Sequence, residues 1–352
     1  MTVMDAPPTS APDVRDLVVG RRRRRRHRLV VTIVLAAAVV AVFAGTLMVG
    51  ESFYGPVDVI KVIFGQTVPG ASFTVGDLRL PRASLGLLAG FAFGIAGVTF
   101  QTMLRNPLAS PDVIGISSGA SAAAVFGIVV LSLDGPAVSL LALVGALVTA
   151  MAIYLLSDRG GFAGTRLILI GIGVAAMLES VVSYVLSKAA SWDLQTAMRW
   201  LTGSLNGADW ASVVPVAIAC AVLVPVLLAQ QRGLGAMRLG DGLATGLGVR
   251  VPRTRVLALL AAVALLAIAT AGAGPIAFVA FMSGPIAVRL VGPGASPLLP
   301  AGLVGSLLVM LSDLVGQFAL DGRYPVGVIT GVLGAPYLIF LLTRMNRSGS
   351  SL

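Results

Sequence analysis

The chain has 352 residues, of which 57% are hydrophobic and 11% are charged, and its formal net charge is +10. Its mean hydropathy is +0.96. This composition excludes an ordinary water-soluble domain, because the long segments show no polar helix faces with paired charges outside the short polar breaks. Apolar runs of roughly 17 to 25 residues, the length that crosses a bilayer as helix, recur instead. The sequence therefore predicts an all-α membrane protein.

Residue types that serve catalysis or metal binding are scarce. The only cysteine, Cys220, lies in an apolar run, and the only histidine, His27, lies in a basic run. They cannot form a His/Cys metal cluster or a Ser/His/Asp nucleophilic set. The two lysines, Lys61 and Lys188, do not follow a glycine as a phosphate-binding loop requires. We therefore expect no enzymatic activity, no metal and no cofactor in this chain.

Residues 1–28 end in the basic run RRRRRRHR at positions 21–28. Such a run can bind nucleic acid, but its place directly before an apolar segment favours the cytoplasmic anchor of a first transmembrane helix. That segment is too long for the core of a signal peptide, and no A-x-A cleavage site follows it. We expect residues 1–28 to be a disordered cytoplasmic tail, with no nucleic-acid partner.

Apolar runs between short polar breaks predict ten transmembrane helices within a domain of residues 29–347, followed by a short tail at 348–352. Arginines are concentrated in the breaks on the side of the N-terminus, so both termini are expected in the cytoplasm. The predicted spans are 29–50, 82–104, 113–132, 136–157, 166–187, 210–230, 254–272, 275–292, 299–319 and 325–344.

The second predicted span is expected to be central in the bundle. Glycines at intervals of three and four residues clear one of its faces, so that a neighbouring helix can approach closely. They are Gly86, Gly90, Gly94 and Gly97.

The stretch LRNPLASPDVIGISSGAS at residues 104–121 separates two apolar runs. Pro107 and Pro111 stop the preceding helix, and non-helical backbone at membrane depth needs protein or water around it. We place the stretch at the cytoplasmic mouth, where it is either a plain turn or a short rigid turn that projects Asn106 and Leu108. A second polar-rich break at 321–336 is typical of transporters built from two related halves.

The longest cytoplasmic loop, residues 232–255, contains LGDGLATGLGV. This segment is long enough for one or two helical turns, with Leu243 and Leu247 on one face. The apolar pair favours a docking surface for a cytoplasmic partner over a merely solvated loop.

Two acidic residues, Glu179 and Asp313, lie well inside predicted spans. Carboxylates within a membrane are functional candidates, so Glu179 is a candidate for the transport pathway and raises the hypothesis of a proton-coupled secondary transporter. The alternative is that each carboxylate is hydrogen-bonded within the bundle or lies near the end of a span.

Seven motifs occur in the order found in the FecCD-type permeases, the membrane subunits of ABC importers for ferric siderophores, haem and cobalamin. The chain resembles this family over about Arg79 to Arg344, most closely its ferric-enterobactin branch. The resemblance implies the ten-helix type II importer fold. The motifs are RLPR at Arg79, RNPLASPDVIGISSGAS at Arg105, RLILIGIG at Arg166, GSLNGADW at Gly203, GDGLATGLGV at Gly240, GPIAFVAF at Gly274 and YPVGVITGVLGAPYLI at Tyr324.

The resemblance also implies roles for residues at matching positions. Arg79 and Arg82 match the site that binds acidic residues of the external binding protein, and Arg323 is a further candidate because Gln317 stands where some members have a third arginine. The cytoplasmic gate would consist of Asn106, Leu108 and Thr165. The segment that contacts the ATPase would include Gly240, Asp241, Leu243, Ala244, Leu247 and Gly248.

The expected function is that of one permease subunit of an ATP-driven ferric-siderophore importer in a bacterial plasma membrane. A cobalamin or haem permease is the alternative within the family. The implied partners are a second permease, which this branch favours as a different chain, two ATP-binding subunits that hold ATP and Mg, and an extracytoplasmic binding protein. The chelate would cross intact, because the spans contain no histidine and no carboxylate cluster that could strip and hold a bare iron ion.

Overall fold

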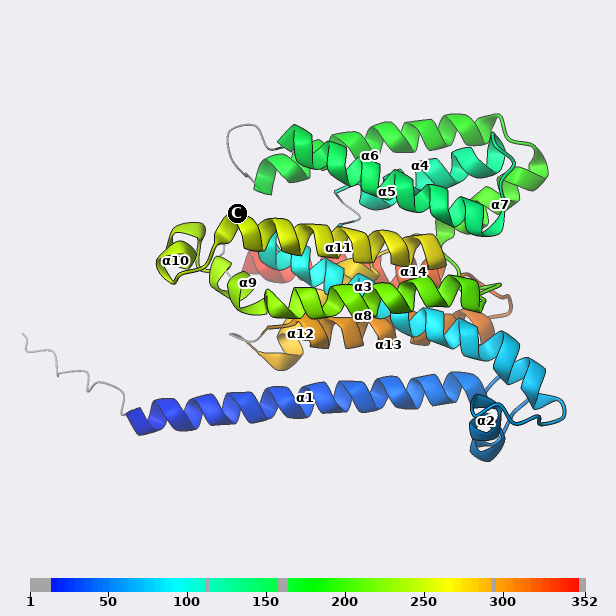
Figure 1. Ribbon diagram of the computed structural model, residues 1–352, viewed down its shortest axis with the longest axis horizontal. Helices are drawn as coiled ribbons and strands as arrows, with labels where there is room; N and C mark the ends of the chain where they lie inside the picture. Colours follow the sequence, from blue (N-terminus) through cyan, green and yellow to red (C-terminus); the bar gives the residue numbers. More distant parts are fainter. Residues whose placement is uncertain (1–13, 112–113, 158–163, 293–295, 348–352) are drawn as a thin grey trace, which may run out of the picture.

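The computed structural model describes residues 14–111, 114–157, 164–292 and 296–347, and every regular element among them is a helix (Figure 1). This confirms the prediction of an all-α membrane protein. In chain order the elements are α1 (Val14–Met48), α2 (Pro56–Ile63), the π-helix η1 (Ser72–Arg79), α3 (Leu80–Leu104), α4 (Ile116–Val129), α5 (Gly135–Ser157), α6 (Gly164–Ser187), α7 (Ser191–Thr202), α8 (Trp210–Ala229), α9 (Gln231–Met237), α10 (Asp241–Gly246), α11 (Val251–Ala273), α12 (Val279–Val291), α13 (Leu298–Phe318) and α14 (Val326–Arg347).

Helix α1 begins earlier than predicted. The composition of residues 1–28 predicts a disordered tail, but the chain is helical from Val14 onward, and residues 1–13 lie outside the described part. Arginine is a good helix former, and the apolar span supplies a nucleus from which the helix propagates. The 35 residues of α1 are about 52 Å long, more than a hydrocarbon layer of about 30 Å requires. Its basic N-terminal part therefore extends beyond the apolar part of the bundle.

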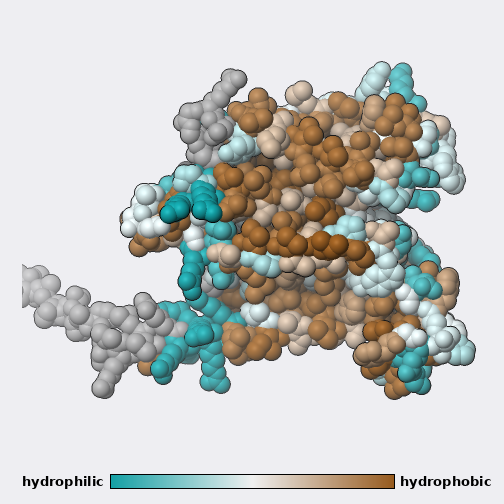
Figure 2. Space-filling model, viewed as in Figure 1, coloured by the Kyte–Doolittle hydropathy of each residue, from teal (hydrophilic) through white to brown (hydrophobic). Residues whose placement is uncertain are grey.

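Eight helical segments are long and apolar enough to cross a membrane: Arg22–Met48, Ser72–Leu104, Gly135–Ser157, Gly164–Ser187, Trp210–Ala229, Val251–Ala273, Leu298–Phe318 and Val326–Arg344. Two shorter apolar helices, α4 and α12, occupy the positions of the third and eighth predicted spans. The count of ten spans stays a prediction. Figure 2 shows a broad belt of apolar side chains between two more hydrophilic ends, as expected for a chain embedded in a bilayer.

The two ends of the bundle differ in what they carry (Figure 1). We call the end with α9, α10 and the basic part of α1 the basic end, and the end with α2 and α7 the opposite end. Helices α4, α5 and α6 form a layer on one side, and α1 lies along the other side. Helix α1 packs loosely, since only 6% of its span is buried.

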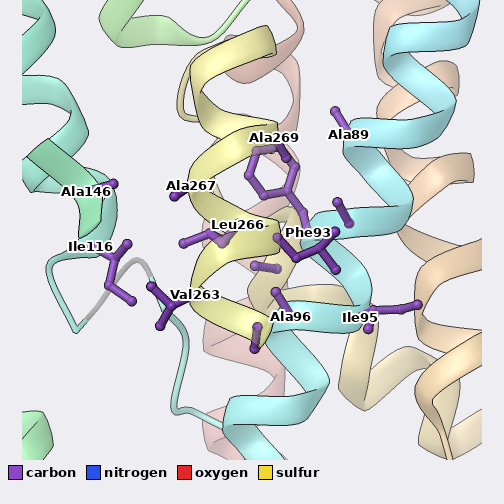
Figure 3. Close-up of a cluster of buried hydrophobic side chains, with 14 of the residues drawn as sticks. Ala89, Phe93, Ile95, Ala96, Ile116, Ala146, Val263, Leu266, Ala267 and Ala269 are labelled. Carbon is purple, nitrogen blue, oxygen red and sulfur yellow. The ribbon is translucent and has the colours of Figure 1, made fainter. Parts of the chain in front are cut away.

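The prediction that the second span is central is confirmed, because 78% of the span that includes α3 is buried. Figure 3 shows side chains of α3 and α11, among them Phe93 and Leu266, gathered between these helices, with Ile116 of α4 and Ala146 of α5 beside them. The glycine face of α3 meets α13. A Cβ atom built on Gly90 would lie 2.5 Å from the Gly305 carbonyl oxygen, so only glycine permits this approach.

Helices α4 and α12 both begin inside the bundle. Gly115 before α4 packs against Gly171 near the middle of α6, and Phe278 before α12 packs against Gly334 near the middle of α14. Both preceding residues have left-handed backbone, with φ of 91° and 63°. The helices therefore start at Ile116 and Val279, three and four residues later than the predicted spans. Residues 114–115 and 274–278, which directly precede the two helices, are non-helical backbone inside the bundle, and such backbone must be surrounded by protein.

Candidate functional site

The irregular stretch after α3 divides into an exposed turn and a buried segment. Arg105 and Pro107 are exposed at the basic end, whereas Ala109, Ser110 and Pro111 are buried. Residues 112–113 lie outside the described part, and the chain is buried again from Ile114. Non-helical backbone inside a membrane must be surrounded by protein or water. The described part of this stretch meets that condition because it is buried in protein after the exposed turn.

The turn at Asn106 is held by its own side chain. The Leu108 amide donates to the Asn106 Oδ1 at 2.9 Å, and the Ala109 amide donates to the Asn106 carbonyl at 3.1 Å. Side chains of this type commonly stabilise turns in this way. Leu108 is half-buried. The short turn predicted from the two prolines is therefore present.

Thr165 lies close to the same turn. A Cβ atom built on Gly164 would lie 3.0 Å from the Leu104 Cδ2, so the start of α6 abuts the end of α3. Thr165 itself is exposed. The structure thus brings the three gate candidates, Asn106, Leu108 and Thr165, to one end of the bundle.

The predicted short helix in the loop 232–255 is confirmed as α10, and α9 precedes it. Ala244 is fully buried, whereas the side chains of Leu243 and Leu247 are 64% and 67% exposed. Gly240 and Gly248, which flank the helix, have φ of 106° and 83°, a region that favours glycine. The fold therefore presents two apolar side chains to the outside at the basic end.

Asp241, the first residue of α10, is paired with two arginines. Its Oδ2 lies 2.7 Å from the Arg255 Nη2, and its Oδ1 lies 3.5 Å from the Arg105 Nη2. One carboxylate therefore joins α10 to α11 and to the turn that follows α3.

Arg79, at the opposite end of the bundle, forms hydrogen bonds with three backbone carbonyl groups. Its guanidinium donates to the carbonyls of Leu47, Met48 and Ser52 at distances of 2.7 to 3.1 Å. The last carbonyls of a helix have no partner within the helix, so this contact caps α1. The Arg79 guanidinium carbon also lies 5.2 Å from the Tyr54 ring centroid.

Arg82 forms a bidentate pair with Asp313 of α13, with nitrogen to oxygen distances of 2.7 and 2.9 Å. Gln317 donates to the same carboxylate at 2.7 Å, and Asn206 accepts from Arg82. Asp313 is 5% exposed. The pair therefore couples the ends of α3 and α13, and it gives Asp313 an arginine partner rather than a serine or backbone partner.

Arg323 is the most exposed of the three docking candidates, with 71% of its side chain exposed, and it pairs with Glu51. Arg79, Arg82 and Arg323 all lie near the opposite end, and each has a partner within the chain. Their role in docking stays a prediction, and a docking carboxylate would have to share or replace these partners.

Glu179 lies on the outer surface of α6 and is exposed, as are Ser180 and Ser183. Only 22% of this span is buried. A carboxylate that faces lipid is costly, so this face of α6 requires water or another protein chain next to it.

Comparison with known proteins identifies the family. The sequence profile of the FecCD transport family matches residues 25–344. The chain belongs to the FecCD transport family. It is 40% identical over 312 residues to the achromobactin transport system permease protein CbrC of Dickeya dadantii, which covers 88% of this chain and 89% of that protein. It is 40% identical over 290 residues to the ferric enterobactin transport system permease protein FepG of Escherichia coli, which covers 82% and 88%.

A more distant FecCD relative is the iron(3+)-hydroxamate import system permease protein FhuG of Bacillus subtilis, 36% identical over 88% of this chain and 95% of that protein. The fold matches the solved structure of an inward-facing putative metal-chelate type ABC transporter, with a TM-score of 0.77 over 89% of this chain and 98% of that chain. The identity is 24%, so this likeness concerns the fold. The predicted importer permease fold is thereby confirmed.

Two contacts of this FecCD chain escape sequence reasoning. Asp313 and Arg82 are 231 positions apart, and Asp241 and Arg105 are far apart too. The sequence does place Arg82 and Asp313 at the same end of two predicted spans. Counting charges on each side of the membrane, however, does not predict that these two side chains form a pair. Within the described residues no group of three or more His, Cys, Asp or Glu side chains could hold a metal ion.

Proposed function

We propose that this FecCD chain is one permease subunit of an ATP-driven importer that moves a ferric siderophore, as an intact chelate, into the cytoplasm. The observation that carries the proposal is the match of residues 25–344 to the family, together with relatives at 40% identity that are named for achromobactin and ferric enterobactin transport. The chain would take no part in ATP hydrolysis, which would belong to separate subunits that hold ATP and Mg.

A second permease, different from this chain, would pack against the exposed face of α6. The exposed Glu179, Ser180 and Ser183 support this, because a polar face in the membrane needs a partner chain or a wet pathway. Two permeases around one pathway would place Glu179 next to the passing chelate. Two ATP-binding subunits and an extracytoplasmic binding protein would complete the importer.

The basic end would lie in the cytoplasm of a bacterium, with the chain in the plasma membrane. The exposed arginines 22–26 of α1 and the exposed Arg238, Arg250 and Arg253 at the basic end support this orientation. The gate candidates Asn106, Leu108 and Thr165 would then close the inner mouth, and Arg79, Arg82 and Arg323 would face the binding protein.

Helix α10 would be the contact with the ATPase, because Leu243 and Leu247 are exposed at the basic end. The substitution Leu243→Asp places a charge in an apolar contact and should detach or uncouple the ATPase. The measurement is copurification of the ATP-binding subunit and its stimulation in proteoliposomes. Unchanged copurification and stimulation would contradict this assignment.

The substrate and energy source are tested together in a strain that lacks this chain. Growth on single siderophores as sole iron source should fail for one chelate and return with the wild-type chain, and uptake should require a functional partner ATPase. Uptake that follows only the proton gradient would instead support a secondary transporter that uses Glu179. Loss of cobalamin or haem use with normal siderophore use would indicate the other branch of the family.

Docking of the binding protein is tested with a double variant that removes both charges of the Arg82–Asp313 pair. In the double variant Arg82→Gln with Asp313→Asn, neither group leaves an unpaired charge behind. If Arg82 binds the external protein, this variant stays folded but binds that protein more weakly than wild type does. Equal binding by the two would remove Arg82 from the docking site.

A further inference from the structure

Two of the contacts between helix α10 and the bundle matter here. One is Ala244, which is fully buried, and the other is the Asp241 carboxylate. Leu243 and Leu247 are exposed. A force applied to these leucines can therefore reach the rest of the chain through the carboxylate.

The two arginines at this carboxylate sit on different elements and in different surroundings. Arg255 belongs to the first turns of α11, has a side chain that is only 11% exposed, and lies 2.7 Å from Asp241. Arg105 follows α3 directly, is 48% exposed, and lies 3.5 Å away. The first contact is the shorter and more buried one, so it is the stronger of the two.

Arg105 directly precedes the gate candidate Asn106 in the chain. It has left-handed backbone with φ of 55° and forms the C-cap of α3. The next amide, that of Asn106, donates to the Gln101 carbonyl at 3.1 Å, and the Asn106 side chain accepts from Leu108. A pull on the Arg105 side chain therefore acts on the backbone residue that directly precedes the turn with Leu108.

We propose that the Asp241 carboxylate transmits the movement of α10 to the turn at residues 105–108, with Arg255 as its fixed partner and Arg105 as its moving partner. The inference rests on the proposed function, because it takes α10 as the ATPase contact and the turn as the inner gate. Asp241 and Arg105 are positioning residues in this scheme.

Stability is a poor test of this link. Half-exposed ion pairs contribute little to folding, so breaking this one should leave the melting temperature of the purified complex nearly unchanged. Its effect should appear instead in how the turn responds to nucleotide. If Arg105 had a purely structural role, its substitution would lower the melting temperature and leave the response of the turn to nucleotide unchanged.

The test measures the labelling rate of a thiol in the turn, in the complex with its ATP-binding subunits. The variant Leu108→Cys is made with Cys220→Ala, which removes the only native thiol of this chain, and is exposed to a membrane-impermeant maleimide in inverted vesicles. The rate is compared without nucleotide and with ATP and vanadate. We expect it to change by about fivefold or more, the size of a typical coupling between sites.

Adding Arg105→Gln should abolish this nucleotide response while basal ATP hydrolysis and copurification persist. Arg105→Lys, which keeps the charge, should retain much of the response. Arg24→Gln removes one exposed cytoplasmic charge from α1 and serves as the matched control, with the full response expected.

Three results would overturn the link. A response in Arg105→Gln equal to that of the control shows that the ion pair transmits nothing, while the gate and the ATPase contact stand. A turn that does not respond to nucleotide in any variant refutes both the link and the gate. A response lost in Leu243→Asp but kept in Arg105→Gln likewise refutes the link and leaves the ATPase contact intact.

Discussion

The pair of Arg82 and Asp313 illustrates how one buried carboxylate constrains the residues around it. Asp313 is 5% exposed, and its two oxygens are satisfied by Arg82 and Gln317. Such a pair contributes little net stability, but removing one member leaves the other charge uncompensated. Arg82 can therefore serve in docking only at a cost to this network, unless Asp313 changes with it.

We predict that Arg82→Gln lowers the free energy of unfolding by about 3 kcal/mol, because it leaves the Asp313 carboxylate without its cation. The double variant with Asp313→Asn should recover most of the loss. Thermal unfolding of the purified chain, arranged as a double-mutant cycle, measures both effects. Additive losses in the cycle would show that the two side chains do not interact.

Asp209 is the N-cap of α8, just outside the membrane-spanning part. Its Oδ1 accepts from the Ser212 hydroxyl and the Ser212 amide at 2.7 and 2.9 Å. These hydrogen bonds hold the pKa of the Asp209 carboxyl below its usual value. The ionised carboxylate therefore stabilises the folded state at neutral pH, and this stabilisation is lost as the pH falls through the pKa of the folded state.

We predict that Asp209→Ala destabilises α8 by about 1 kcal/mol, whereas Asp209→Asn, which keeps a capping acceptor, costs less. The advantage of aspartate over asparagine should be full at neutral pH and should vanish as the pH falls through the lowered pKa of the folded state. Thermal unfolding at several pH values tests this. A stability difference between wild type and Asp209→Asn that does not depend on pH would contradict the carboxylate's role.

At the scale of helices, the packing of α3 against α13 depends on the absence of side chains. A Cβ atom on Gly94 would overlap the Ala301 carbonyl, and one on Gly90 would lie 2.5 Å from the Gly305 oxygen. Lipid tails are as apolar as the helices, so close packing of this kind replaces the hydrophobic effect as the source of association. The same contact holds α3 at the centre of the bundle.

We predict that Gly94→Ala lowers the free energy of unfolding by about 1 to 3 kcal/mol, because the backbone of α13 must move. Gly45→Ala in α1 is the matched control, since a Cβ atom there meets nothing within 4 Å. It should be neutral or slightly stabilising. Equal melting temperatures for the two variants would mean that the helices do not pack this closely.

At the scale of the whole molecule, the turn at residues 105–108 and the start of α6 meet at one end. The gate prediction concerns the assembled importer, in which two permeases would contribute these residues. Leu108 would be an apolar plug and Asn106 a polar neighbour. The alternative, a plain interhelical turn, has the same local geometry in a single chain.

We predict that Leu108→Ala combined with Asn106→Ala raises the nucleotide-independent leak of a small solute from proteoliposomes, because both substitutions shorten side chains of the proposed gate at the basic end. Folding should be retained, as judged by copurification with the ATPase. Ser132→Ala, at the far end of α4, provides a comparison on an exposed turn. A tight double variant would show that the stretch is only a turn.

The sequence alone determined the class of protein, the approximate place of the spans and the central position of the helix with Gly90 and Gly94. These follow from composition and from periodicity along one helix, which need no knowledge of distant residues. The short helix with Leu243 and Leu247 was also predictable, because its apolar spacing is local. The family roles of Arg79 and Asn106 came from motifs and not from physics.

Only the tertiary structure decided the late starts of α4 and α12, the helical state of residues 14–28, and the partners of Arg82, Arg79 and Asp241. A helix start inside the bundle depends on whether other helices can surround irregular backbone, which no local pattern encodes. Ion pairs such as that of Arg82 with Asp313 join positions 231 residues apart, so they exist only once the helices have packed. Charge counting places such residues on one side of the membrane, but the geometry of packing selects which of them meet.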